Sequence, residues 1–127
     1  IPEIDLDPDL ISEALTCIIE NACEAAPSTD GLIEISVSRE DVRNSSGLYG
    51  SGVADGDYIK ITVKDNGKGF NPDDSAVMFD PYYSTKKDRD GVGLALAYSI
   101  LKRHRGFITA ALPQSGSSLF SVFVPLF

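Results

Sequence analysis

Residues 59–70, IKITVKDNGKGF, are the stretch from which the fold can be worked out. Ile59, Ile61 and Val63 alternate with polar residues, and this period of two predicts a β-strand with one buried face. The strand leads directly into Asp65 and a turn with glycines at 67 and 69, which permit φ > 0 and close backbone approach. A carboxylate at the strand end could accept a hydrogen bond from an exocyclic amine, but the same residues also suit an ordinary turn.

A second strand is predicted upstream of the first. Ile33, Ile35 and Val37 show the same alternation. Residues 43–57, RNSSGLYGSGVADGD, separate the two strands and hold four glycines and three serines without periodicity. We interpret them as a flexible hairpin loop between partner strands and not as a domain boundary.

The segment before these strands has the pattern of an amphipathic helix. Asp7 suits the N-cap and Pro8 the first turn, while Pro27 and the residues at 28–31 end the helix. Three glutamates, at 13, 20 and 24, fall on the side opposite an apolar stripe. The stripe has 4-3-4-3 spacing and consists of Ile11, Leu15, Ile18, Ala22 and Ala25.

Asn21 stands at the edge of that stripe, between the apolar and the acidic side. A buried amide is costly unless its hydrogen bonds are satisfied. Asn21 therefore either bonds to the backbone or binds a ligand or a hydrated metal ion. An amide oxygen is a suitable ligand for magnesium.

The second half of the chain predicts further helices and two further strands. A short helix near 72–78 and a polar loop at 80–91 precede a helix from Val92 to His104. Strands near 106–112 and 118–124 follow, joined by a turn at Pro113–Gly116. Helices segregated from such a sheet give an α+β fold, a two-layer sandwich with a mixed, mostly antiparallel sheet and helices on one face. The glycine spacing disfavours a dinucleotide-binding βαβ unit.

Gly91, Val92 and Gly93 open the second long helix directly after a basic stretch. Exposed amides and the positive end of a helix dipole make such a helix start a natural phosphate site, and Lys86 and Lys87 could add charge-assisted contacts. Residues 84–106 hold six basic and two acidic residues, whereas residues 1–30 hold eight acidic and no basic ones. This contrast favours one anionic ligand, although a solvated helix face also accounts for residues 102–105.

Length and composition fit one soluble domain over residues 1–127, with 43% hydrophobic and 24% charged residues. The net charge of −8 argues against a nucleic-acid surface. No apolar run approaches the roughly 18 to 20 residues that span a bilayer. Because the chain opens on Ile1 and not on Met, we interpret it as part of a longer protein.

Cys17 and Cys23 turn to different sides of one helix, which predicts reduced, partly buried thiols without a disulfide.

Four segments resemble, in their order along the chain, the four boxes of the GHKL ATPase superfamily. They are the helix around Asn21, the Asp-x-Gly-x-Gly turn from Asp65, MFDPYYSTKK at 78–87 and DGVGLALAYSILKRHRGFI at 90–108. The tail SSLFSVFVP at 117–125 resembles the final strand of that family. The resemblance covers nearly the whole chain and is nearest to histidine kinases of the nitrogen-regulator type. It implies the Bergerat-type ATP-binding fold.

The resemblance also implies ATP and Mg2+ as cofactors and a role for particular residues. Asn21, in the N box, holds the magnesium; Asp65 reads adenine; Ser118 takes the place of a threonine that helps to bind adenine through water. The F box at Phe79–Lys86 belongs to an ATP lid over 71–91, and the last glycine box falls on Gly91–Leu96. The expected ATP-binding residues are Asn21, Glu24, Asp65, Gly67, Gly69, Phe70, Thr85, Lys86, Gly91, Val92, Gly93, Leu94, Ala95 and Ser118.

Two positions depart from the family pattern. The family has a further asparagine one turn before Asn21, where this chain has Cys17, and a thiol is a poor magnesium ligand. The third glycine of the last box is Ala95, which could restrict the approach of phosphate. Both departures could weaken nucleotide binding.

The implied function is that of the ATP-binding catalytic domain of a sensor histidine kinase. The γ-phosphoryl group of ATP is expected to be transferred to a histidine on a separate dimerisation domain of the parent chain. The receiver domain of a response regulator is the second expected partner. The chain is expected to be monomeric and cytoplasmic, or the cytoplasmic part of a membrane-bound parent. His104, between Arg103 and Arg105, is expected at the surface near a helix C-terminus and is not the acceptor. Two alternatives stay open: a stand-alone GHKL protein kinase of the anti-sigma-factor type, and a degenerate nucleotide-binding domain used for docking.

Overall fold

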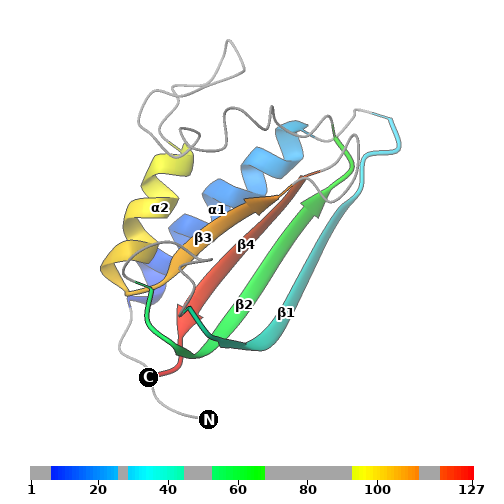
Figure 1. Ribbon diagram of the computed structural model, residues 1–127. Coiled ribbons are helices and arrows are strands. Elements are labelled where there is room, and N and C mark those ends of the chain that lie inside the picture. The colour runs from blue at the N-terminus through cyan, green and yellow to red at the C-terminus, as the bar shows by residue number, and fades with distance from the viewer. Residues whose placement is uncertain (1–6, 26–28, 45–52, 68–92, 112–117) are drawn as a thin grey trace.

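The computed structural model describes residues 7–25, 29–44, 53–67, 93–111 and 118–127. These ranges form two helices and four strands, in the order α1 (Pro8–Ala25), β1 (Ile33–Val42), β2 (Gly56–Asp65), α2 (Gly93–Arg103), β3 (Phe107–Ala111) and β4 (Ser118–Pro125). The strands form one sheet in the order β1-β2-β4-β3, and every neighbouring pair is antiparallel. Both helices lie on one face of this sheet (Figure 1). The α+β two-layer sandwich is therefore confirmed; the mixed pairing that was expected does not occur among the described strands.

The predicted elements lie where the sequence pattern indicated. β1 and β2 pair as a hairpin with Ile35 opposite Val63, and α2 falls within the predicted helix from Val92 to His104. The short helix near 72–78, the polar loop at 80–91 and the turn at Pro113–Gly116 were also predicted, and they lie outside the described residues. Over the described ranges, no helix combines the length and the apolar character needed to cross a membrane.

Asp7 caps α1 as predicted. Its Oδ1 accepts hydrogen bonds from the backbone N–H groups of Asp9 (3.0 Å) and Leu10 (3.2 Å). These bonds satisfy two of the donors that a helix N-terminus leaves without an intrahelical partner. Further along α1, Cys17 is half-buried and Cys23 is exposed, and neither forms a disulfide. The expectation of two partly buried thiols is thus wrong for Cys23, because position 23 lies outside the buried stripe.

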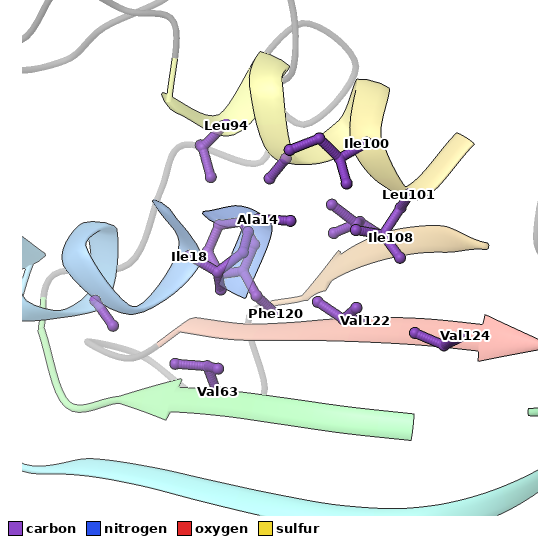
Figure 2. Close-up of a cluster of buried hydrophobic side chains, with 12 residues drawn as sticks. Ala14, Ile18, Val63, Leu94, Ile100, Leu101, Ile108, Phe120, Val122 and Val124 are labelled. Atoms are coloured by element: carbon purple, nitrogen blue, oxygen red, sulfur yellow. The ribbon is translucent and has the colours of Figure 1, made fainter. Parts of the chain in front are cut away.

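The main core fills the space between the two helices and the sheet (Figure 2). α1 contributes three residues at four-residue spacing, Ala14, Ile18 and Ala22, each at most 1% exposed. The other buried members come from α2 and from strands β2, β3 and β4: Val63, Leu94, Ala97, Ile100, Leu101, Ile108, Phe120, Val122 and Val124. The buried line of α1 therefore runs through Ala14, while Ile11 and Leu15 of the predicted stripe are only partly buried.

β1 is an edge strand, and the two apolar side chains in its middle are largely exposed. Ile35 is 52% and Val37 is 66% exposed. Among the described elements, α1 packs on β2, and α2 packs on β3 and β4, which agrees with the exposure of Ile35 and Val37 on β1. The alternation at 33, 35 and 37 thus predicts the strand correctly, but it does not indicate burial.

The C-terminus of α2 ends in a Schellman motif without glycine at its left-handed position. Arg105 has φ of 62°, and its N–H donates to Lys102 O at 3.1 Å, while Gly106 N–H donates to Leu101 O at 2.7 Å. At the last helical turn, His104 Nε2 accepts a hydrogen bond from Asp7 N–H at 3.0 Å, and Nδ1 lies 2.8 Å from Ile100 O. His104 therefore joins the end of α2 to the start of α1, near the helix C-terminus as expected, although it is half-buried.

A second, smaller core lies on the other face of the sheet, at the end where β1 passes into β2. It consists of Val42, Tyr58, Phe107 and Phe123, with Val53 packed against them. The Tyr58 hydroxyl donates to Ala54 O at 2.7 Å. Asn44 Nδ2 donates to Val53 O at 3.1 Å. The described ends of the predicted 43–57 loop are therefore tied to this second core.

Candidate functional site

Asp65 is the last residue of β2 and is buried, with 1% of its surface exposed. Its carboxylate accepts hydrogen bonds from two residues of the chain. Ser118 Oγ donates to Oδ2 at 2.5 Å, and Gly67 N–H donates to Oδ1 at 2.8 Å. The first partner comes from the neighbouring strand, since Asp65 and Ser118 are directly paired in the β2–β4 register. The second comes from the turn that follows β2.

This arrangement fixes the orientation of a buried carboxylate while leaving it able to bind more. A carboxylate offers about four lone-pair positions, and the bonds from Ser118 and Gly67 use one at each oxygen. The remaining capacity suits a donor such as an exocyclic amine. The structure thus brings together three residues of the predicted site: Asp65, Gly67 and Ser118.

Asn66 is a residue of this turn that the sequence analysis missed. Its Oδ1 accepts a hydrogen bond from Leu32 N–H at 2.8 Å, and its Nδ2 donates to Asp30 O at 2.8 Å. Its own N–H donates to Leu32 O at 3.3 Å. The side chain therefore ties the turn after β2 to the segment that enters β1. An Asn before a Gly gave a turn signal, and nothing in the sequence indicated partners 34 and 36 positions away.

The end of α1 carries Asn21, which is expected at the metal, and Glu24, which is expected to bind ATP. Asn21 is half-buried and Glu24 is exposed; they are three positions apart, so they share one side of the helix. An amide oxygen and a carboxylate are the hard oxygen ligands that Mg2+ takes, usually together with waters and substrate phosphates. Cys17, one turn earlier, adds no suitable ligand. The donor set fits a magnesium ion whose other ligands come from a nucleotide. Among the described residues, no group of three or more His, Cys, Asp and Glu side chains could hold a metal ion by itself.

The start of α2 carries the described part of the last glycine box. Gly93 is the first helical residue and is half-buried, as is Ala95. The Leu94 side chain belongs to the main core, so only its backbone is left to face a ligand. Within the described part of the chain, no acidic residue lies in the first turn of α2, where a carboxylate would compete with a bound anion for the positive end of the helix dipole.

These three parts of the site lie at one end of the sandwich (Figure 1). The C-terminal end of α1, the end of β2, the start of β4 and the start of α2 all meet there, while His104 lies at the opposite end of α2. Six residues of the predicted site lie outside the described residues: Gly69, Phe70, Thr85, Lys86, Gly91 and Val92. The predicted lid over 71–91 also lies outside them.

The comparisons with known proteins agree on one family. Residues 6–127 match the family described as histidine kinase-, DNA gyrase B-, and HSP90-like ATPase. The chain is 32% identical over 126 residues to the sensor histidine kinase ZraS of Escherichia coli (strain K12), and this match covers 99% of this chain and 24% of ZraS. It is 26% identical over 126 residues to sporulation kinase E of Bacillus subtilis (strain 168), and this match covers 99% of this chain and 15% of that kinase. The chain thus spans about a quarter or less of these relatives.

Solved structures show the same fold. The mycobacterial sensor histidine kinase MprB superposes with a TM-score of 0.71 at 15% identity, over 96% of this chain and 76% of that one. The catalytic domain of histidine kinase ThkA gives a TM-score of 0.69 at 20% identity, over 96% of this chain and 70% of that one. The two-layer sandwich of this chain is therefore the fold of histidine kinase catalytic domains.

Proposed function

The chain belongs to the family of histidine kinase-, DNA gyrase B- and HSP90-like ATPases, and on that premise we propose that it is the ATP-binding catalytic domain of a sensor histidine kinase. Membership of this ATPase family implies that the chain binds ATP. The proposal treats residues 1–127 as one domain, with 43–57 as a loop and 71–91 as the ATP lid. It also assigns the domain to the cytoplasm, where ATP is available.

The observation that carries the proposal is the buried carboxylate of Asp65, held from two sides by Ser118 and Gly67. Adenine has an exocyclic amine at position 6 that can donate to this carboxylate. Guanine has a carbonyl oxygen there, which would face the carboxylate without a shared proton and leave a buried charge poorly satisfied. Asp65 therefore both binds adenine and discriminates against guanine.

The phosphates extend from this base toward the start of α2. The backbone amides at Gly93 and Leu94, with the positive end of the helix dipole, would receive their negative charge. Asn21 and Glu24 would hold magnesium, which would supply positive charge against the phosphates. The roles of Gly91, Val92, Thr85 and Lys86 follow the family pattern and are part of the proposal.

The reaction is the transfer of the γ-phosphoryl group to a histidine of a dimerisation domain in the parent protein. The bond between the γ-phosphorus and its bridging oxygen breaks, a phosphorus–nitrogen bond forms, and ADP leaves; the chain contributes positioning and charge stabilisation. The phosphoryl group would then pass to the receiver domain of a response regulator. The proposal of a further domain in the parent chain is supported by the length of ZraS, which is about four times that of the matched region.

His104 is not the acceptor in this proposal. Both of its ring nitrogens have partners, Asp7 N–H and Ile100 O, and it lies at the end of α2 remote from Asp65 (Figure 1). The isolated chain should therefore bind ATP without becoming phosphorylated. Incubation with labelled ATP tests this, and a stable phosphohistidine on the chain would contradict it.

Calorimetric titration with ADP and with GDP, each with and without Mg2+, tests the binding function. We expect ADP to bind more tightly than GDP by a factor on the order of a hundred, because about 2–3 kcal/mol is at stake in the hydrogen bonds of one buried carboxylate. We further expect Mg2+ to strengthen the binding of ADP. Equal affinity for both nucleotides would contradict the proposal that Asp65 recognises adenine. If neither nucleotide gives a heat of binding, the alternative of a degenerate domain used for docking is favoured.

A further inference from the structure

We propose that Asn66 is a positioning residue of the nucleotide site: it clamps the turn after β2 to the segment entering β1, and so holds Asp65 in the geometry that reads the base. The inference rests on the proposed function, because it assigns a role toward the same nucleotide. Asn66 was not among the residues that the family pattern implied. Its role follows from three hydrogen bonds and from its place in the chain.

The clamp uses both ends of the Asn66 amide. Leu32 N–H donates to Oδ1 and Nδ2 donates to Asp30 O, each at 2.8 Å. An amide is the side-chain group that offers an acceptor and a donor at this short reach. Aspartate could keep the first bond but not the second, and alanine would keep neither. The backbone N–H of Asn66 adds a bond to Leu32 O at 3.3 Å.

The clamp acts on the site through the two residues on either side of Asn66. Asp65 precedes it and Gly67 follows it, and Gly67 N–H donates to Asp65 Oδ1 at 2.8 Å. That bond exists only while the backbone of the turn keeps its present path. If the clamp is removed, the turn gains freedom, and the carboxylate loses part of its fixed orientation before a nucleotide arrives. The cost appears as weaker binding, because the site must then be ordered during association.

The other side of the clamp leads back to α1. Asp30 has φ of 61°, a left-handed conformation that non-glycine residues adopt infrequently and that Asp and Asn adopt more often than most. Its carbonyl oxygen is held by Asn66 in that conformation. The same connection leaves the end of α1 that carries Asn21 and Glu24. Asn66 thus ties the turn that carries Asp65 to residues 30 and 32, directly before β1.

Asn44 provides a matched control. It is the same residue type, its Nδ2 also donates to a backbone carbonyl, Val53 O at 3.1 Å, and it also ties a connection next to β1. It lies beyond the other end of that strand, remote from Asp65 (Figure 1). Asn44→Ala therefore reports what the loss of a comparable tie does to the fold alone.

The experiment measures the Kd of ADP with Mg2+ by calorimetry for the unaltered chain, Asn66→Ala, Asn66→Asp and Asn44→Ala, below the unfolding temperature of each. We expect Asn66→Ala to weaken binding about tenfold, the change that corresponds to about 1.4 kcal/mol. Asn66→Asp keeps the bond from Leu32 and should weaken binding less, and it replaces Asn66→Ala should that variant fail to fold. Asn44→Ala should bind within twofold of the unaltered chain. Amide NMR adds a local readout: the Gly67 resonance should shift in both Asn66 variants and stay in place in Asn44→Ala.

The outcomes separate this inference from the proposed function. If the unaltered chain does not bind ADP, the proposed function fails first. If it binds and the folded Asn66 variants bind within twofold of it, the clamp has no role in the site and the inference is overturned. Equal losses in Asn66→Ala and Asn44→Ala would also overturn it, because they would show general destabilisation. Loss confined to the Asn66 variants, together with the Gly67 shift, supports it.

Discussion

Ser118 donates a hydrogen bond from Oγ to Oδ2 of Asp65 at 2.5 Å, although the two residues are 53 positions apart. They are directly opposite in the β2–β4 pairing, and both side chains are buried. The bond fixes the orientation of the carboxylate at the end of β2, and β2 ends at the same end of the sandwich at which α1 ends and α2 begins (Figure 1). The proposed recognition of adenine depends on this alignment.

Ser118→Ala should weaken ADP binding about threefold to tenfold and destabilise the fold by about 1 kcal/mol, because it removes one hydrogen bond from a buried carboxylate. Ser121→Ala is the control, since Ser121 is the other buried serine of β4 and pairs with Thr62. Calorimetry and urea unfolding of both variants check the prediction. It fails if the two variants lose ADP affinity equally.

The contacts of the site that could be predicted are those between residues close together in the sequence. Asp65 and Ser118 were each assigned from the family pattern, but their direct bond required the strand order β2-β4, which no local signal contains. Asn66 was missed for the same reason, since its partners at Asp30 and Leu32 belong to another connection. Local features were predictable. The Asp7 cap is an example, because its carboxylate accepts hydrogen bonds from Asp9 and Leu10, two and three positions along the chain.

Two features of the fold show the limits of local patterns in another way. Alternation identified β1, yet burial of Ile35 and Val37 depends on which strands the helices cover. At the end of α2, glycine is the residue favoured at the left-handed position. Here Arg105 takes that position, and Gly106 follows it because space is lacking there. Tertiary packing decided both cases.

Val63→Ala and Val37→Ala should differ strongly in their effect on stability. Val63 is 0% exposed in the main core, and Val37 is 66% exposed on the adjacent strand. Removing two buried methyl groups should cost about 2 kcal/mol, whereas the exposed substitution should change stability by less than about 0.5 kcal/mol. Urea unfolding measures both. Similar losses would mean that β1 is covered in solution.

Gly106→Ala should destabilise the chain by about 3 kcal/mol, the upper end of the cost of overpacking. A Cβ at this position would lie 2.2 Å from Phe123 O and 2.9 Å from Leu101 Cδ1. The first contact is with the backbone of β4, which cannot turn aside. Thermal unfolding checks the prediction, and an unchanged unfolding temperature would contradict it.

Tyr58 should make the fold sensitive to alkaline pH. Burial raises the pKa of its hydroxyl above 10.0; Arg105 lowers this pKa and Asp55 raises it further. The folded state therefore holds the phenolic proton more tightly than the unfolded state does. This contribution to stability is complete below the unfolded pKa of about 10 and is lost as the pH rises through the folded pKa.

Tyr58→Phe tests that dependence. The variant loses the bond to Ala54 O, which should cost about 1 kcal/mol at neutral pH, but its stability should fall less steeply above pH 10. Urea unfolding of Tyr58→Phe and of the unaltered chain, each at neutral and at alkaline pH, checks this prediction. Identical slopes in both proteins would rule out Tyr58 as the cause.

The most direct test of the account is the Kd of ADP with Mg2+ in Asp65→Ala, with Asp57→Ala as control. Asp57 lies on the same strand, but its carboxylate is paired with Arg39 near the other end of the sheet. We predict that Asp65→Ala weakens binding by about 1.5–3 kcal/mol, the range for a hydrogen bond to a charged group, and that Asp57→Ala leaves it unchanged. If folded Asp65→Ala binds ADP as tightly as the unaltered chain does, Asp65 does not read adenine.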